Sequence, residues 1–323
     1  MDAVVSNSRD MIRKGSRSFA LASRLFDTAT RDDAWMLYAW CRHCDDQIDD
    51  QQLGMTPAIQ PARDPAASLA RLYTETRRAI AGEVVTDPVF LGLQRVVRQH
   101  DIPERHVLEL LAGFEMDVAD YRYRTIEETL SYCYRVAGVV GVMMAHLMGV
   151  RDPRALQRAA DLGIAFQLTN ISRDVLDDWR NGRCYLPDQW LREAGIPEDG
   201  VAGPEHRIAL ASVVRRLLTE ADRYYESAGC GLRALSFTSG WAVATALGVY
   251  RDIGHIVLRQ GSRAWHARAV VSAPRKVLRV AGGALRALQA ITVDRWYRAP
   301  PRAVGLWATP DLSPDGDLEQ YRD

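Results

Sequence analysis

The chain has 323 residues, 47% hydrophobic and 25% charged, which is the composition of a soluble globular protein with a sizeable core. Basic and acidic residues number 41 each, so the balanced charge gives no argument for nucleic-acid binding. The five scattered cysteines do not make a disulfide framework, and neither a signal peptide nor an apolar run of transmembrane length is evident. We therefore expect a cytoplasmic protein.

Helical spacing of apolar residues dominates the sequence, whereas alternating strand patterns are scarce. We predict an all-α protein. From residue 300 onward proline, aspartate and glycine dominate, which predicts a poorly ordered tail over 300–323. The expected helices cover residues 30–50, 67–82, 88–100, 104–122, 126–150, 153–180, 206–229 and 239–260.

The segment Gly15-Ser16-Arg17-Ser18 precedes an apolar helical stretch. Small hydroxyl residues and a glycine at this place are typical of a helix N-cap. The same groups, with the charge of Arg17, also suit a phosphate, because helix N-termini present free N–H groups.

The first acidic segment carries Asp45 and Asp49, four residues apart and so on one face of the predicted helix. Tyr38 and Arg42 precede them along the same row. Asp46 and the following Asp50 offer a second register, rotated by about 100°. We choose Asp45 and Asp49, because this row runs with Arg42 along the edge of the apolar stripe.

The second acidic segment places Gln167, Asn170, Asp174 and Asp178 on one face of the helix predicted over 153–180. Two carboxylates about 6 Å apart repel by roughly 3 kcal/mol at an effective dielectric of about 20. A cation with oxygen ligands, Mg²⁺, is the usual remedy, and it fills its shell with water and substrate phosphate oxygens. One hypothesis is therefore a magnesium–diphosphate clamp between two helices, and the other is two solvated acidic faces.

Three further features allow more than one interpretation. Gly138 and Gly141 each cost about 1 kcal/mol inside a helix, which indicates either close helix packing or room for a long apolar ligand. Asp117 and Asp120 are expected to cap a helix or lie on the surface. A basic patch near Lys276 resembles an ordinary surface feature.

Four motifs together resemble the squalene/phytoene synthase family, with the similarity running from about residue 11 to 276 and closest to its bacterial phytoene synthases. Their order and spacing are specific, although either aspartate pair alone is a weak signal. The motifs are Tyr38-Ala39-Trp40-Cys41-Arg42 ahead of Asp45-x-x-x-Asp49, the segment 132–141, the segment 167–178, and Gly182-Arg183-Cys184-Tyr185-Leu186-Pro187.

The resemblance implies the isoprenoid synthase fold, one domain over residues 1–299 with helices around a central cavity. It implies head-to-head (1'-1) condensation of two geranylgeranyl diphosphates through prephytoene diphosphate to phytoene, with Mg²⁺ or alternatively Mn²⁺ and without NADPH. The alternatives are squalene or dehydrosqualene synthesis from farnesyl diphosphate, a class I terpene cyclase, and a non-enzymatic assembly protein. Because the implied product is a hydrophobic hydrocarbon, we also expect a loose association of the protein with the inner face of the cytoplasmic membrane. The oligomeric state is left open.

The resemblance also assigns roles residue by residue. It gives metal binding to Asp45, Asp49, Asn170, Asp174 and Asp178, and counts the four aspartates as catalytic. Gly15 departs from the family pattern, because relatives commonly carry histidine there. The substrate-binding residues implied are Gly15, Ser16, Arg17, Ser18, Tyr38, Arg42, Tyr132, Gln167, Arg173, Tyr250 and Arg268.

Overall fold

The computed structural model describes residues 2–15, 17–49, 64–310 and 312, and these residues contain helices and loops but no strand. The prediction of an all-α protein is confirmed. The α-helices are α1 (Ala3–Gly15), α2 (Arg17–Ser23), α3 (Thr28–Ile48), α4 (Pro65–Ile80), α5 (Pro88–His100), α6 (Glu104–Val118), α7 (Ile126–Cys133), α8 (Val139–Leu147), α9 (Pro153–Arg180), α10 (Asp188–Glu193), α11 (Arg207–Gly229), α12 (Phe237–Gln260) and α13 (Ala273–Thr292).

Three of these helices start at the same dipeptide. Asp64-Pro65, Asp87-Pro88 and Asp152-Pro153 begin α4, α5 and α9. In each, the aspartate carboxylate accepts a hydrogen bond from a backbone N–H two or three residues further on, at 3.0, 2.8 and 3.3 Å. Proline fits the first helical position because that N–H would have no partner within the helix, so the dipeptide fixes each start.

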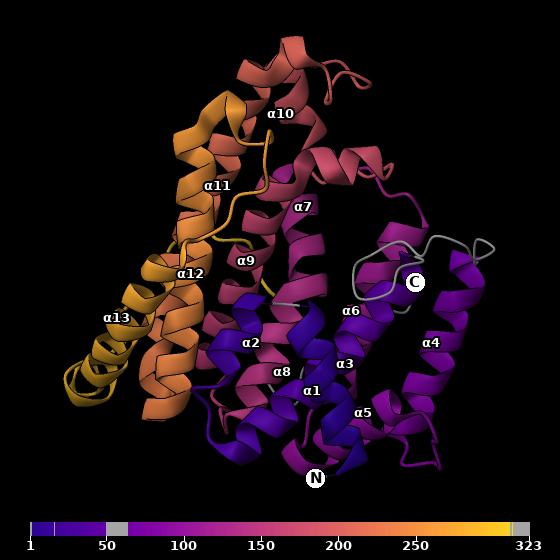
Figure 1. Cartoon of the computed structure of the whole chain (residues 1–323), viewed down its shortest axis with the longest axis vertical. Coiled ribbons are helices and arrows are strands. Elements are labelled where there is room, and N and C mark those ends of the chain that lie inside the picture. The colour runs from indigo at the N-terminus through magenta and orange to yellow at the C-terminus, as the bar shows by residue number, and fades with distance from the viewer. Residues whose placement is uncertain (1, 16, 50–63, 311, 313–323) are drawn as a thin grey trace.

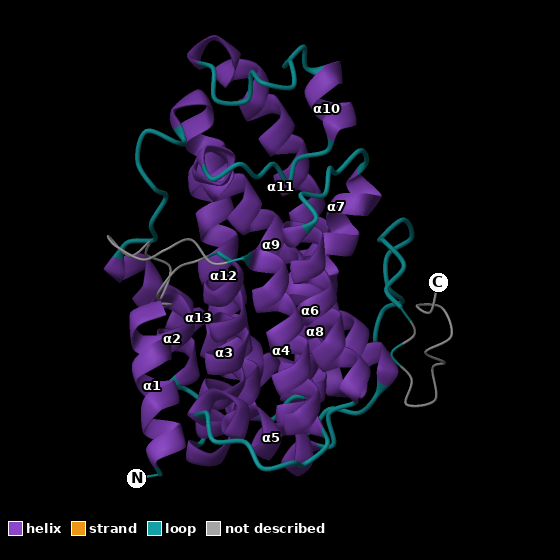
Figure 2. Ribbon diagram, turned by 90° about the vertical axis from the view of Figure 1, so that its right-hand side faces the viewer, coloured by secondary structure: helices purple, strands orange, loops and turns teal. Residues whose placement is uncertain are grey.

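The long helices run roughly along the long axis of the molecule (Figures 1 and 2). The 28-residue α9 lies near the centre and packs against α8, α11 and α12. On the other side, α3 packs against α1 and α5. The helix α13 lies at the edge and packs mainly on α12 (Figure 1).

The helix predicted over 126–150 is interrupted. A π-helical turn, Tyr134–Gly138, separates α7 from α8. A Cβ at Gly141 would lie 2.3 Å from the carbonyl oxygen of Ala159, and one at Gly163 would lie 2.1 Å from that of Ala137. The glycines therefore serve close packing of this segment on α9, which is one of the two interpretations of Gly141, and both also line the cavity between the helices.

The stretch Ile126–Leu147 meets the length and composition of a membrane span, contrary to our expectation that no such run exists. However, 61% of its apolar window is buried inside the protein. Since it packs against α6 and α9, it has the surroundings of a core helix.

The predicted tail over 300–323 is described only to residue 310 and at Leu312. Arg302 in this part contacts the fully buried carboxylate of Asp161, with Nη2 at 2.7 Å from Oδ1. The backbone N–H of Trp307 donates to the hydroxyl of Tyr224 at 2.9 Å. The start of the segment is therefore held against the body.

Candidate active site

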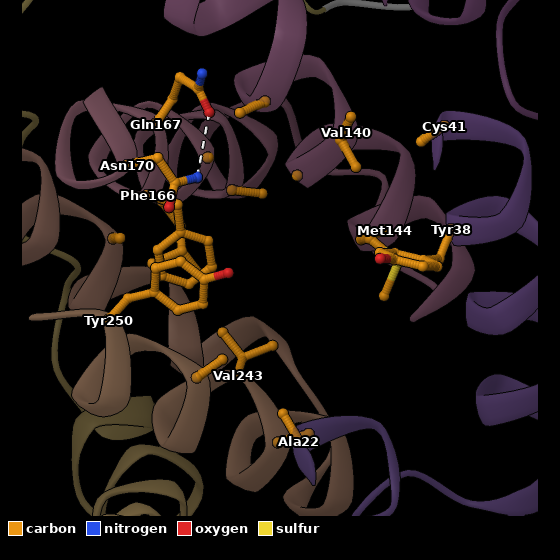
Figure 3. A pocket seen from close by; sticks show the side chains of 18 of the residues that line it. Ala22, Tyr38, Cys41, Val140, Met144, Phe166, Gln167, Asn170, Val243 and Tyr250 are labelled. Carbon is orange, nitrogen blue, oxygen red and sulfur yellow. Dashed lines mark hydrogen bonds between the residues drawn. The ribbon is translucent and has the colours of Figure 1, made fainter. Parts of the chain in front are cut away.

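A cavity of about 750 Å³ lies between α3, α8, α9 and α12 (Figure 3). Its wall is mostly apolar, and the ring of Phe166 stacks on that of Tyr250 with centroids 4.2 Å apart. Such a wall excludes water from whatever the cavity holds. Among the apolar residues that line it are Phe26, Leu37, Phe114, Val136, Val140, Met144, Leu162 and Val243.

Both helices with acidic segments contribute polar side chains to this one cavity. In Figure 3, Gln167 and Asn170 of α9 lie across the hollow from Tyr38 of α3. The two segments, more than a hundred residues apart in the sequence, therefore meet at one space. Of the predicted site residues, Tyr38, Arg42, Asp45, Tyr132, Gln167, Asn170, Arg173, Tyr250 and Arg268 line the cavity.

The row on α3 is organised by Arg42. Its guanidinium contacts Asp45 at 2.8 Å and Asp46 at 2.7 Å. Asp46 is buried, whereas Asp45 is half-buried and lines the cavity, which favours the register we chose. The competing register ends at Asp50, which lies outside the described residues. Burial and the neighbouring carboxylate of Asp49 raise the pKa of Asp45 to about 7.

The row on α9 is held by two arginines that line the cavity. Arg173 Nε donates to Asp174 Oδ1 at 2.8 Å, and Arg268 donates to Asp174 Oδ2 at 3.0 Å. One turn further on, burial and the charge of Asp174 raise the pKa of Asp178 to about 8. Asp49, Asp174 and Asp178 do not themselves line the cavity: Asp49 is one turn beyond the lining Asp45, Asp174 directly follows the lining Arg173, and Asp178 is one turn beyond Asp174.

Arg183 connects the two rows. Its Nη1 lies 2.5 Å from Asp49 Oδ1, and its charge also acts on the carboxyl of Asp178. Although Arg183 belongs to the motif 182–187, we assigned it no role from the sequence. A conspicuous arginine just after an acidic helix is the signal that could have found it.

Asp117 corrects one expectation, because it is neither a helix cap nor a surface acid. Its carboxylate accepts hydrogen bonds from Tyr132 at 3.1 Å and Tyr185 at 2.9 Å. The two tyrosine rings stack with centroids 4.7 Å apart. Burial raises the pKa of Asp117 to about 6. The hydroxyl of Tyr132 is thus fixed at the cavity wall.

Comparisons with known proteins identify this architecture. A family model described as squalene/phytoene synthase matches residues 12–275. The chain belongs to the squalene/phytoene synthase family. It is 48% identical over 311 residues to the 15-cis-phytoene synthase of Pantoea ananas, covering 95% of this chain and 98% of that one. It is 50% identical over 300 residues to the corresponding protein of Enterobacter agglomerans, covering 92% and 99%.

The solved structures confirm the isoprenoid synthase fold that the resemblance implied. A dehydrosqualene synthase in complex with ligand matches with a TM-score of 0.77 and 27% identity, covering 87% of this chain and 95% of that one. A squalene synthase from Alicyclobacillus acidocaldarius matches with a TM-score of 0.70 and 22% identity, covering 80% and 94%.

The donor set of this family member fits a magnesium ion bound with diphosphate. Asn170 Oδ1 is buried and has no hydrogen-bond partner in the described chain, while its amide nitrogen donates to Gln167 at 3.3 Å. The described residues hold no group of three or more histidine, cysteine or acidic side chains around one point. Mg²⁺ usually takes only one or two carboxylates and completes its octahedron with water and phosphate oxygens, so separate rows suffice.

Part of the segment predicted to bind phosphate lies outside the residues that the structure describes. Ser16 is outside the described residues, and so are the side chains of Gly15, Arg17 and Ser18. Lys14, directly before them, lines the cavity, as does Lys276. Sequence reasoning assigned no role to either lysine, although Lys14 adjoins the segment in question and Lys276 belongs to the basic patch.

Proposed function

We propose that the protein condenses two geranylgeranyl diphosphates head to head (1'-1), through prephytoene diphosphate, to 15-cis-phytoene, the first committed step of carotenoid biosynthesis. One observation carries the proposal: over nearly its whole length, the chain is about 50% identical to curated 15-cis-phytoene synthases. The cavity agrees with it, because Arg42, Arg173, Arg268 and Asp45 line the same space as many apolar side chains.

The arginines and acids act on the diphosphate leaving group. Arg42, Arg173 and Arg268 line the cavity, and their positive charge stabilises the negative charge that develops as the diphosphate departs. When bound, Mg²⁺ neutralises the same charge. The residues that would hold it are Asp45, Asp49, Asn170, Asp174 and Asp178, with Mn²⁺ as a substitute.

The apolar walls act on the carbocations. Ionisation of one substrate leaves an allylic cation, which the alkene of the second substrate attacks, and loss of a proton gives prephytoene diphosphate. Ionisation of this intermediate leaves a second cation, which rearranges and loses a proton. Water must not reach either cation. Phe166 and Tyr250 stack at this wall, and Asp117 holds the hydroxyl of Tyr132 in place. Gln167 and Tyr38 line the same space, and the segment 15–18 adds phosphate contacts from the end of α1.

A second candidate is dehydrosqualene or squalene synthesis from farnesyl diphosphate, favoured by the structural match to a dehydrosqualene synthase. Purified protein is incubated with geranylgeranyl or farnesyl diphosphate and Mg²⁺, with and without NADPH, and the products are separated by chromatography. We expect phytoene from the longer substrate and no dependence on NADPH. Product from the shorter substrate alone would reject the proposal in favour of the second candidate.

Substitution of the acids tests whether the protein is an enzyme or an assembly protein. Asp45→Ala and Asp174→Ala should each lower turnover by about a thousandfold or more while the circular dichroism spectrum keeps its helical shape. Ile208→Ala, at an exposed position on α11, is the matched control. Full biological activity of both acid variants in cells would instead indicate an assembly role.

We also propose that the protein is cytoplasmic and associates loosely with the inner face of the cytoplasmic membrane, since the product is a hydrocarbon. Extraction of membranes with carbonate should release it. A pool that wholly resists extraction would contradict a peripheral attachment.

A further inference from the structure

The exposed apolar side chains are concentrated on one part of the molecule. Most of the large apolar residues that the described chain exposes lie between residues 270 and 304, on α13 and the turn after it. Leu278 is 58% exposed and Leu285 is 71% exposed, and Trp296 is 87% exposed. Single exposed apolar residues are ordinary, but a contiguous group marks an interaction surface.

The helix α13 is apolar on the side that a surface helix normally makes polar. Its inner face is built of small residues, since Gly283, Ala287 and Ala290 are buried, and a Cβ at Gly283 would lie 2.5 Å from Thr245 Oγ1 of α12. The helix lies at the edge of the molecule (Figure 1). Its outer face carries the exposed Leu278 and Leu285. Because the small residues of α13 pack closely on α12, the apolar stripe of α13 faces outward.

Positive charge flanks this stripe. Lys276, Arg295 and Arg298 form no ion pair within the described part of the chain. By contrast, Arg275 and Arg279 both turn to Asp252 of α12, at 2.9 and 2.5 Å. An apolar face with unpaired cations at its ends suits the interface of a bilayer with anionic headgroups, where the helix lies in the plane of the surface.

The mouth of the cavity adjoins the start of α13. Val270, 68% exposed, and Lys276 both line the cavity, as does Arg268 with a side chain that is 63% exposed. A surface docked along α13 would therefore bring lipid to the cavity mouth, so that an apolar chain could pass between the two without crossing water.

We propose that the outer face of α13, together with Trp296 and Tyr297, docks the protein on an anionic lipid bilayer beside the cavity mouth. This inference rests on the proposed function only where it states that apolar molecules move between the bilayer and the cavity. Docking on the bilayer does not require turnover. A second copy of the chain is the competing occupant of this face.

The test measures co-sedimentation of the full-length protein with vesicles of phosphatidylglycerol and of phosphatidylcholine. The double variant L278Q/L285Q should bind phosphatidylglycerol vesicles about tenfold or more weakly, because each leucine loses its apolar burial. The double variant R295Q/R298Q should bind more weakly in the same way, and wild type should bind phosphatidylcholine poorly. The control V84Q/I208Q removes two apolar side chains elsewhere that are more exposed than the two leucines, and it should bind as wild type does.

Tryptophan fluorescence gives a second measurement. Vesicles of phosphatidylglycerol should shift the emission of wild type to the blue, and Trp296→Phe should remove most of that shift. Turnover in detergent should stay unchanged in L278Q/L285Q, which separates failed docking from failed chemistry. Equal binding of wild type and L278Q/L285Q would overturn the proposal. So would a wild-type dimer that this variant converts to monomer, since a second copy would then cover the face.

Discussion

Replacing Gly163 with alanine tests how the cavity wall is built. The new Cβ would lie 2.1 Å from the carbonyl oxygen of Ala137 and 2.7 Å from the Cα of Gly138. Real Cβ atoms essentially never approach within 3.0 Å, and both neighbours are backbone, so the two segments must separate by about 1 Å. Such overpacking costs about 1–3 kcal/mol, and here it exceeds the gain of up to about 1 kcal/mol that alanine brings to a helix.

The assay is thermal unfolding followed by circular dichroism, with Gly282→Ala as the matched control. A Cβ at Gly282, in the middle of α13, meets nothing within 4 Å, so this variant should be as stable as wild type or slightly more so. At about 2.1 cal/mol/K per residue, 1 kcal/mol shifts the Tm of a chain of 323 residues by about 1.5 °C. Since both variants gain equally from the alanine, Gly163→Ala should have a Tm about 1.5–4.5 °C below that of Gly282→Ala.

The same substitution should also lower activity, because the π-helical turn and α9 carry adjoining parts of the cavity wall. A displacement of about 1 Å in a positioned site can reduce a rate by about a hundredfold. If Gly163→Ala were as stable and as active as Gly282→Ala, the close packing would not position the site, and the reasoning would be refuted.

Two further predictions concern stability. Asp45 and Asp178 have pKa values of about 7 and about 8 in the folded protein, against 3.8 in the unfolded chain. Between these pH values the two carboxyls bind more protons in the metal-free folded protein than in the unfolded chain. Below about pH 6.5 the buried His106 and His146, whose pKa values are lowered to about 3 and about 4, oppose this trend. The Tm in EDTA should therefore fall as the pH rises from about 6.5 to 8, and a rising Tm in that range would contradict the burial of these acids. Arg302→Ala leaves the buried carboxylate of Asp161 without its ion pair, and urea denaturation should show a loss of about 3–5 kcal/mol. Arg298→Ala, which breaks no ion pair in the described residues, should show no loss; equal stabilities of the two variants would count against the contact.

Much of the fold could be predicted because local signals and packing agree. The aspartate–proline starts of α5 and α9 are visible in the sequence, and the spacing along α9 put Asn170 and Asp174 on one face. We did not predict α13, although its apolar residues recur at helical spacing; what this spacing could not show is that the apolar side faces outward while small residues face the core.

The rest of the site depends on contacts between distant segments. The bond from Tyr185 to Asp117 joins residues 68 positions apart, and the contact of Arg183 with Asp49 joins residues 134 positions apart. Hydrophobic periodicity describes one helix at a time. It therefore cannot show which arginine of a loop contacts which aspartate of a distant helix. The break at Tyr134–Gly138 is equally hidden, since the apolar pattern runs through it unchanged.

The central claim is that acids on α3 and α9 hold metal-bound diphosphate at the end of one apolar cavity. It is tested most directly by a crystal structure with Mn²⁺ and an unreactive thio-analogue of geranylgeranyl diphosphate, with anomalous scattering locating the metal. We expect Mn²⁺ between Asp45 and Asn170, with the prenyl chains along Phe166. Manganese bound elsewhere, or prenyl chains outside the cavity, would contradict the account.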